Sequence, residues 1–259
     1  MSEEKILLET RRLSVSIAGQ TICRDLDLRL QAGERLAILG RNGAGKSTLL
    51  SVLAGLRAAD AGELHLGGAS YAELGPRAAA RLRGWLPQAR GDAFASTVLE
   101  TALVGRHPHL DRWDWETAAD AQIARAALAA VGLGEFARRD VQTLSGGERQ
   151  RLAIATLLTQ APPLYLLDEP IAHLDLKHQI AVLRLFAERT QRADIACVMV
   201  LHEPGLAVRF CDRALLLHAD GSTQLGDAST IINAESLGRL YAHPLREVRD
   251  GELRWFIPA

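Results

Sequence analysis

A glycine-rich segment at residues 40–48 constrains this chain more than any other part of its sequence. The segment reads GRNGAGKST and fits the pattern G-x-x-x-x-G-K-[ST] at every fixed position. An apolar run of strand character, residues 35–39, precedes it, and a run of helical character, residues 49–54, follows it. Such glycines can also form an ordinary turn before a helix, but a strand, a glycine-rich turn and a helix in succession favour a phosphate-binding loop.

The parts of this loop have separate expected functions. The glycines let the backbone turn several N–H groups inward, so that they and the N-terminus of the next helix surround a polyphosphate. Lys46 is expected to reach the β and γ phosphates, and the hydroxyl of Ser47 is expected to bind Mg²⁺. The residues predicted to bind the nucleotide here are Gly40, Arg41, Asn42, Gly43, Ala44, Gly45, Lys46, Ser47 and Thr48.

The composition is that of a soluble globular protein. Of the 259 residues, 48% are hydrophobic and 24% are charged, and the length allows one large α/β domain or two closely joined units. A formal net charge of −1 argues against a general nucleic-acid binder. The three scattered cysteines predict neither disulfides nor a zinc site, so a reducing cytosol is the simplest setting. We expect no signal peptide and no membrane-spanning segment, so any membrane role requires a partner.

The hydrophobic pattern predicts a mainly parallel sheet with an additional antiparallel layer. Strands at 6–17 and 26–30 lead into the strand before the phosphate loop. After residue 160, short apolar runs alternate with helical patterns, which is typical of parallel strands covered by helices. The predicted strands of this part are 164–168, 196–201 and 213–218, and the predicted helices are 176–191 and 204–211.

A helix-rich block separates the two parts of the predicted sheet. Residues 97–100 and 145–148 have capping-box spacing, so each is expected to open a helix, and another helix is expected at 115–131. Near the end of the chain, the pair DG at 250–251 is a strong hairpin turn signal. The predicted organisation is a catalytic core with its β layer at 1–89 and 161–243, a helical subdomain at 90–160 and a C-terminal β-hairpin at 244–259.

Two carboxylates follow an apolar strand pattern at residues 163–167. Asp168 and Glu169 alone would be interpreted as solvated surface charge, but a protein with a phosphate loop needs such a pair beside that loop. Asp168 is expected to hold Mg²⁺, and Glu169 is expected to orient or deprotonate the attacking water.

The segment LSGGE at residues 144–148 completes a set of motifs. With them the chain resembles the nucleotide-binding subunit of an ATP-binding cassette (ABC) transporter over nearly its whole length. A serine-capped helix that starts with two glycines is itself a second anion-binding N-terminus. The resemblance implies a RecA-like P-loop NTPase fold that binds ATP and Mg²⁺. It also implies a head-to-tail homodimer, in which Ser145, Gly146 and Gly147 of one subunit face the γ-phosphate held by Lys46 of the other.

Three further positions match the family. By resemblance, Gln88 senses Mg²⁺ and the attacking water, Asp175 communicates across the dimer, and His202 contacts the γ-phosphate. A lone histidine after a strand usually has no such function, but His202 follows the two-carboxylate strand and its helix. The predicted catalytic residues are therefore Glu169, His202 and Gln88, and the predicted Mg²⁺ ligands are Ser47, Gln88 and Asp168.

The sequence also departs from the family. Ile17 stands where the family usually has an aromatic residue stacked on adenine, so we expect the phosphates, more than the base, to specify the nucleotide. Glu203 stands where aspartate is common, and residues 171–172 are atypical. Of the other candidates, His107 and His109 lack further ligands and are expected at the surface, while Trp113 and Trp115 are expected to pack within the helical block.

The resemblance extends to the partners. The chain is most similar to the subgroup that imports iron-siderophores, haem and cobalamin. The similarity lies in residues 104–108, 144–150 and 177–179 and in the spacing from His202 to Asp212. This implies an ATP-hydrolysing importer motor at the cytoplasmic face of the inner (cell) membrane, peripheral through FecCD-type permease subunits that dock on the helical block and the Gln88 loop. A periplasmic or surface substrate-binding protein would act with it indirectly.

Two other functions stay open at this point. One is the motor of an exporter or a lipid extractor. The other is a soluble, non-transport ATPase acting on ribosomes or DNA, although a single cassette without a basic tail disfavours nucleic acid as a partner.

Overall fold

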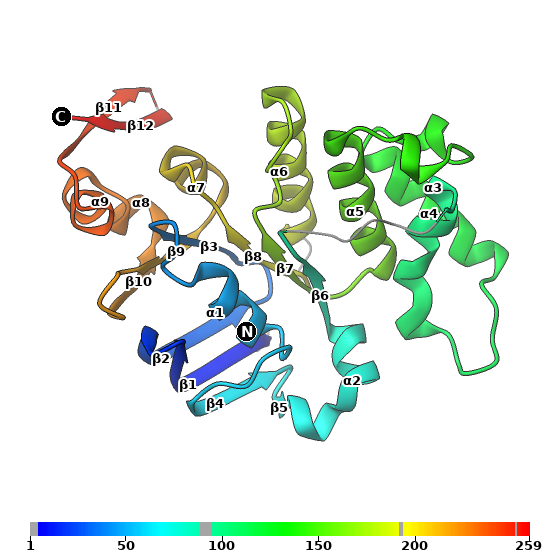
Figure 1. Ribbon diagram of the computed structural model, residues 1–259, viewed down its shortest axis with the longest axis horizontal. Helices are drawn as coiled ribbons and strands as arrows, with labels where there is room; N and C mark the ends of the chain where they lie inside the picture. The colour runs from blue at the N-terminus through cyan, green and yellow to red at the C-terminus, as the bar shows by residue number, and fades with distance from the viewer. Residues whose placement is uncertain (1–4, 89–94, 192–193, 252) are drawn as a thin grey trace.

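A six-stranded sheet follows directly from the alternating pattern of the sequence. The computed structural model describes residues 5–88, 95–191, 194–251 and 253–259. The strand order is β10-β9-β3-β8-β7-β6, and neighbours are parallel except for β10, which is antiparallel to β9 (Figure 1). In this order the strands are Thr223–Asp227, Arg213–Leu217, Arg35–Gly40, Ala196–Val200, Leu164–Asp168 and Arg83–Leu86.

This topology places the chemistry-bearing segments together. Strand β3 lies beside β8, and β8 lies beside β7, all in parallel. The carboxyl ends of parallel strands meet at the same edge of a sheet. The phosphate loop after β3, the two carboxylates at the end of β7 and the histidine after β8 therefore share one edge.

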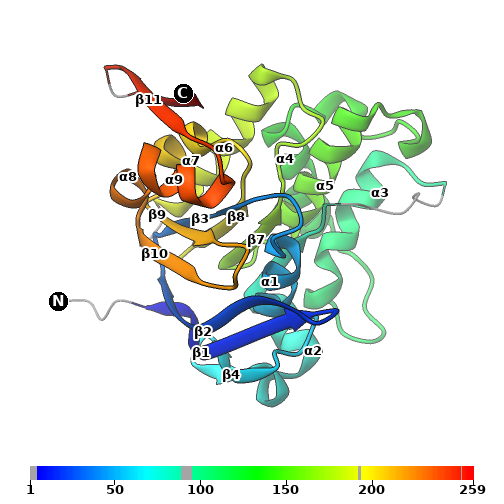
Figure 2. The same ribbon diagram turned by 60° about the vertical axis from the view of Figure 1, so that its left-hand side comes forward.

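An antiparallel sheet forms a second layer. Its strand order is β2-β1-β4-β5, with bounds Gln20–Gln31, Ile6–Ile17, Ala61–Leu66 and Ala69–Ser70. Figures 1 and 2 both show α1 (Lys46–Leu53) between this layer and the six-stranded sheet. The antiparallel layer and the parallel sheet are as predicted, although β2 begins six residues earlier than the predicted strand at 26–30.

Side chains alternate along β3 between two apolar clusters. Leu36 and Ile38 pack with the antiparallel layer and α1, whereas Ala37 and Leu39 pack with helices on the opposite face. All four are fully buried. This period of two in a strand that is apolar throughout is what a parallel strand covered on both faces requires.

Most helical elements between β6 and β7 lie at one end of the molecule (Figure 1). Thr97 and Ser145 each accept a hydrogen bond from the backbone N–H three residues on, and both predicted capping boxes are formed. The predicted boundary at residues 89 and 90 lies outside the described residues. The elements are α3 (Val98–Leu103), η1 (Val104–His109), α4 (Ala118–Ala130), η2 (Gly134–Phe136), η3 (Val141–Thr143) and α5 (Gly146–Gln160).

The start of α4 corrects a sequence prediction. The helix begins three residues later than expected, because Thr117 forms a capping box with Asp120. Trp113 and Trp115 lie before this cap and are each 84% exposed, so the prediction that they pack within the helical block is wrong. Asp120 also pairs with Arg106 (Nε to Oδ1, 2.7 Å). Hydrogen bonds from Thr117, reinforced by Arg106, lower the pKa of Asp120 to about 2.

The remaining helices cover the sheet and lead to the C-terminal hairpin. The short elements β5, β10, α8 and α9 were not predicted, whereas the hairpin was. Helix α2 begins at Tyr71, because Ser70 and Glu73 form a capping box there. Among the described residues, no helix is both long and apolar enough to cross a lipid bilayer. The bounds are α2 (Tyr71–Leu82), α6 (Leu176–Thr190), α7 (Pro204–Phe210), α8 (Ala228–Ile231), α9 (Ala234–Tyr241), β11 (Leu245–Asp250) and β12 (Leu253–Pro258).

Candidate nucleotide-binding site

The turn between β3 and α1 requires its glycines. Gly43 and Gly45 have φ angles of +81° and +87°, in the left-handed region that favours glycine. A Cβ at Gly45 would also lie 2.6 Å from the side chain of Ile22 on β2. At Gly40 a Cβ would lie 2.9 Å from the carbonyl oxygen of Leu217. The backbone path of the loop is therefore available only to a sequence with these glycines.

Lys46 lies folded back over the loop. It is 6% exposed, and its Nζ donates to the carbonyl oxygens of Gly40 (2.9 Å) and Arg41 (3.0 Å). Burial lowers the pKa of the Lys46 amine, while the negative charges of Glu169 and Asp168 oppose that shift. Hydrogen bonds between two charged groups are stronger than those to a neutral carbonyl, so a phosphate is a better partner for this amine.

Ser47 and Asp168 bring two oxygen donors together beside the loop. The Ser47 hydroxyl donates to Oδ1 of Asp168 over 3.0 Å. Asp168 is 2% exposed, and this burial raises the pKa of its carboxyl group. A hydroxyl and a carboxylate are oxygen ligands of the kind that Mg²⁺ binds next to phosphates. The pair could therefore hold a divalent cation.

Glu169 and His202 form a second pair at the same edge. Nε2 of His202 lies 2.7 Å from Oε1 of Glu169, and the side chains are 45% and 16% exposed. Glu169 has a φ of +49°, which is uncommon for a residue other than glycine. Such strain is concentrated at functional sites. A carboxylate held by an imidazole is also a suitable acceptor for a proton from water.

Gln88 follows β6, and Asp175 lies between β7 and α6. Asp175 caps α6 and accepts hydrogen bonds from the backbone N–H of His178 (2.9 Å) and from its ring Nδ1 (2.8 Å). The first of these bonds is the main cause that lowers the pKa of Asp175. Gln88 follows β6 and is exposed, and residues 89–94 lie outside the described residues.

The turn at Ser145, Gly146 and Gly147 is separate from this group. Ser145 donates its backbone N–H to Glu148 (2.7 Å) and accepts from the N–H of Glu148 (3.3 Å). Within the described part of the chain, no hydrogen bond or ion pair connects this turn to Lys46. Figure 1 shows α5 and α1 on either side of α6. The structure thus joins five predicted site residues at the sheet edge, namely Lys46, Ser47, Asp168, Glu169 and His202, and leaves the glycine turn of α5 apart.

One contact at the site has no counterpart in the sequence analysis. Nε2 of Gln150 on α5 donates to the carbonyl oxygen of Pro170 (3.1 Å), directly after the two carboxylates. The capping box at 145–148 places Gln150 one turn into α5, but no pattern in the sequence predicts which carbonyl it reaches. Gln150 links the start of α5 to the end of β7.

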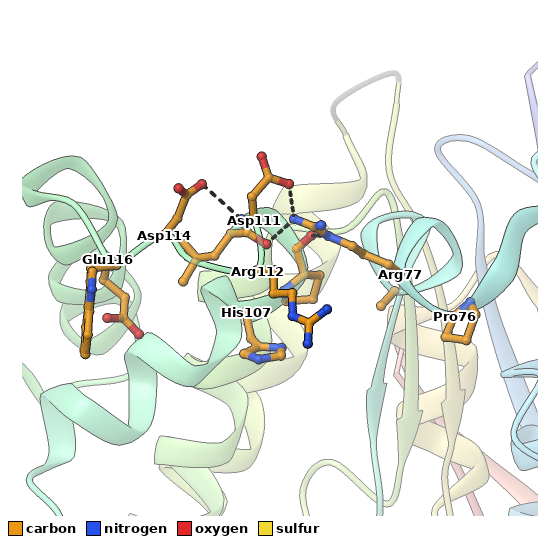
Figure 3. A pocket seen from close by; sticks show the side chains of 11 residues that line it. Pro76, Arg77, His107, Asp111, Arg112, Asp114 and Glu116 are labelled. Carbon is orange, nitrogen blue, oxygen red and sulfur yellow. Dashed lines mark hydrogen bonds and ion pairs between the residues drawn. The ribbon is translucent and has the colours of Figure 1, made fainter.

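A separate cleft of about 670 Å³ lies between α2 and the segment that follows η1 (Figure 3). Figure 3 shows Arg77 of α2 pointing across to Asp111, and the two side chains are 2.8 Å apart. His107, Arg112 and the exposed Trp115 also line this cleft. The other expected surface histidine, His109, is partly buried and bonds the carbonyl oxygen of Gln160 (2.8 Å).

The fold and the site together define a class of protein. The site is that of a P-loop NTPase. It consists of a strand, a phosphate loop with a buried lysine, and two neighbouring strands that end in a carboxylate pair and a histidine. The family model described as ABC transporter matches residues 23–172. The chain therefore belongs to the ABC transporter family and carries its ATP-binding ATPase domain.

Two relatives and one solved structure show which ABC proteins this chain is similar to. A hemin import ATP-binding protein of Deinococcus radiodurans is 44% identical over 237 residues, which are 89% of this chain and 88% of the relative. A cobalamin import ATP-binding protein of Halobacterium salinarum is 40% identical over 83% of this chain, which spans about half of that relative (53%). A solved structure described as an inward-facing, metal-chelate type ABC transporter is 30% identical, with a TM-score of 0.85 and 98% of each chain covered.

Proposed function

We propose that this chain is the ATP-hydrolysing motor subunit of a membrane ABC importer for an iron chelate, haem or cobalamin. The observation that carries the motor function is the meeting of Lys46, the Ser47–Asp168 pair and the Glu169–His202 pair at one sheet edge. The hemin and cobalamin import relatives support the direction of transport and the class of cargo.

ATP binding begins with an exchange of partners by Lys46. Its Nζ leaves the carbonyl oxygens of Gly40 and Arg41, which it now contacts at 2.9 and 3.0 Å, for the β and γ phosphates. The loop N–H groups and the N-terminus of α1 donate to the same phosphates. Ile17, the residue at the position of the usual adenine-stacking aromatic, is 37% exposed at the end of β1, so the phosphate contacts contribute most of the specificity.

Mg²⁺ fits beside this position. The Ser47 hydroxyl and the buried Asp168 carboxylate already converge at 3.0 Å, and Gln88 is the third proposed ligand. When bound, the ion supplies positive charge against the β and γ phosphates. Asp168 serves this function because it ends a buried strand and its position is fixed.

Hydrolysis uses the Glu169–His202 pair. When the γ-phosphate enters, the Nε2–H of His202 donates its hydrogen bond to a phosphate oxygen instead of to Oε1 of Glu169. Glu169 is then free to accept a proton from the attacking water. The bond of 2.7 Å between the two side chains sets the geometry from which both of them reach the same phosphate.

Completion of the site requires a second copy of the chain. The N-terminus of α5, with Ser145, Gly146 and Gly147, is an anion-binding helix end separate from the phosphate loop of its own chain. In a head-to-tail homodimer it closes over the triphosphate of the other copy and stabilises the charge of the transition state. Asp175 lies on the same interface and connects the two sites. Differential affinity of ATP for the closed dimer then drives the permease.

The permease subunits dock at the cleft between α2 and the segment after η1. This cleft is large enough for a segment of a partner and exposes Trp115 beside charged side chains. Helix α2 is followed by β6, and Gln88 follows β6. A displacement of α2 by a partner bound in the cleft would therefore be transmitted to a proposed Mg²⁺ ligand through one strand. The helical subdomain at 90–160 would then move against the core at 1–89 and 161–243. The chain sits at the cytoplasmic membrane face, and the substrate-binding protein acts through the permease.

A single substitution tests the motor function. Glu169→Gln keeps the shape of the side chain but removes the proton acceptor, so we expect ATP hydrolysis to fall by about 10² to 10⁴-fold while ATP still binds. Hydrolysis is measured by phosphate release and binding by titration with a fluorescent ATP analogue. Wild-type turnover in Glu169→Gln would remove Glu169 from this role.

A second experiment tests the partner. Tagged chain is recovered from detergent-extracted membranes of its own host, and a many-span membrane protein is expected to copurify. Trp115→Ala is expected to reduce the recovery, whereas Leu56→Ala, another exposed apolar residue that lies outside this cleft, is the matched control. Recovery with ribosomes alone would contradict the transport function.

A further inference from the structure

The C-terminal hairpin is packed against the helix that directly follows His202. Strand β12 contacts α7, and Figure 1 shows the hairpin next to this helix. A Cβ at Gly205 would lie 2.5 Å from the carbonyl oxygen of Arg254 on β12. The hairpin backbone therefore touches the first turn of α7 at a position where only glycine leaves room.

Arg254 fixes this hairpin to the body of the protein. Its side chain is 9% exposed. Its guanidinium donates to Glu247 on β11 (2.6 and 3.0 Å) and to the carbonyl oxygens of Ser229 and Ile232 (both 2.7 Å). Both carbonyls belong to α8 and its C-terminal end, where Ile232 is fully buried. One side chain thus connects both hairpin strands to the core.

The start of α7 has little support from its own residues. Glu203 occupies the N-cap without a side-chain hydrogen bond to the helix, and Pro204 has no N–H to donate. Beside this turn lies a cleft of about 270 Å³, which is lined by His202 and, from β12, by Trp255 and Phe256. The hairpin therefore borders the space into which His202 and the first turn of α7 would otherwise move.

We propose that Arg254 is a positioning residue for hydrolysis, which holds β12 against Gly205 and thereby keeps His202 aligned with Glu169. This rests on the proposed function of His202 and Glu169. The phosphate loop lies outside the connection from Arg254 through β12 and Gly205 to His202. Loss of that connection therefore lowers turnover and leaves ATP affinity unchanged. A displacement of about 1 Å at a catalytic group lowers rates by up to about 100-fold.

The test compares turnover in single and double variants of the full chain. Arg254→Ala is expected to lower kcat by about 10 to 100-fold with KM for ATP within about twofold of wild type. Arg254→Lys, which keeps one charged donor, is expected to recover part of the rate. Arg246→Ala, an exposed arginine on the same hairpin, is the control and keeps wild-type kcat. In a His202→Ala background, Arg254→Ala is expected to cause no further loss, because both changes remove the same step.

Several results would overturn the inference. One is wild-type kcat in Arg254→Ala, and another is a KM for ATP that rises by the factor by which kcat falls. The third is an equal factor of loss in kcat from Arg254→Ala with and without His202. If Arg254→Ala does not fold, Gly205→Ala replaces it, because its Cβ displaces β12 and leaves the guanidinium intact; wild-type kcat in that variant counts equally against the inference. Wild-type turnover in His202→Ala and Glu169→Gln would instead show that the proposed function is at fault.

Discussion

Helices α1 and α5 both begin at a glycine-containing turn, yet they are prepared for an anion in different ways. At α1 the N-cap is Gly45, no side chain caps the helix, and Lys46 lies buried beside it. At α5, Ser145 and Glu148 bond each other's backbone N–H groups in a capping box. The proposed catalytic lysine and carboxylates lie beside the first helix end, and the second helix end lies apart from them. This difference is what leads us to propose that the catalytic site is divided between two copies.

Removal of the lysine at the start of α1 is expected to change ATP binding more than any change at the start of α5. Lys46→Ala deletes a charged donor to the phosphates, so we expect the Kd for ATP to rise by about 10 to 100-fold. Ser145→Ala is expected to leave the Kd within about twofold, since α5 of the same chain does not reach this ATP. The measurement is a titration with a fluorescent ATP analogue at a protein concentration that keeps the chains apart. Equal losses in both variants would break the comparison.

Capping hydroxyls allow a sharper test with a matched control. Ser145→Ala and Thr97→Ala each remove the hydroxyl of a capping box, at a cost of about 1 kcal/mol of unfolding free energy, or about 2–4 °C in Tm. Hydrolysis is expected to fall only in Ser145→Ala, by about tenfold, because one hydrogen bond to the γ-phosphate is lost. Thermal melts and phosphate release measure the two effects. A similar fall in Thr97→Ala would show that general instability is the cause.

Asp168 is expected to lower stability in exchange for its function. Burial raises the pKa of this carboxyl group, so the folded chain holds the proton more tightly than the unfolded chain does. Stability is therefore lost as the pH rises through the folded pKa. Without nucleotide, Asp168→Asn is expected to melt at a higher temperature than wild type at pH 7, and the difference is expected to shrink toward pH 4, near the unfolded pKa of about 3.9.

The same variant is expected to lose Mg²⁺-dependent hydrolysis. The exposed Asp60 provides the control, and Asp60→Asn is expected to melt like wild type at both pH values. A melting temperature for Asp168→Asn that is below wild type at pH 7 would show that the buried carboxylate stabilises the empty site.

Much of the fold and part of the site geometry could be predicted, because they follow from order along the chain. Once β3, β7 and β8 were expected to be parallel, the residues after them had to meet at one edge. The alternation of helical and apolar patterns and the capping spacings predicted the sheet and two helix starts. These are local or topological properties, which a sequence expresses directly.

Other contacts could not be predicted, because they depend on tertiary packing. Nothing in the pattern indicates that Gln150 bonds the carbonyl of Pro170 or that Arg254 reaches α8. Trp113 and Trp115 were expected to pack within the helical block, but the capping box at Thr117 starts α4 after them. Strand β10 reads TQLGD and lacks the apolar run that marks β7, β8 and β9, while α8 and α9 carry too few residues for a periodic signal.

The most direct measurement tests whether α5 of one copy meets the phosphate loop of another. Asn42→Cys and Gly146→Cys, both at exposed positions, are combined in the Glu169→Gln background, and the native cysteines are all buried. We expect oxidation with ATP and Mg²⁺ to give a disulfide-linked dimer, absent without ATP and absent when Glu135→Cys replaces Gly146→Cys. A crosslink within one chain, or none that depends on ATP, would contradict the divided site.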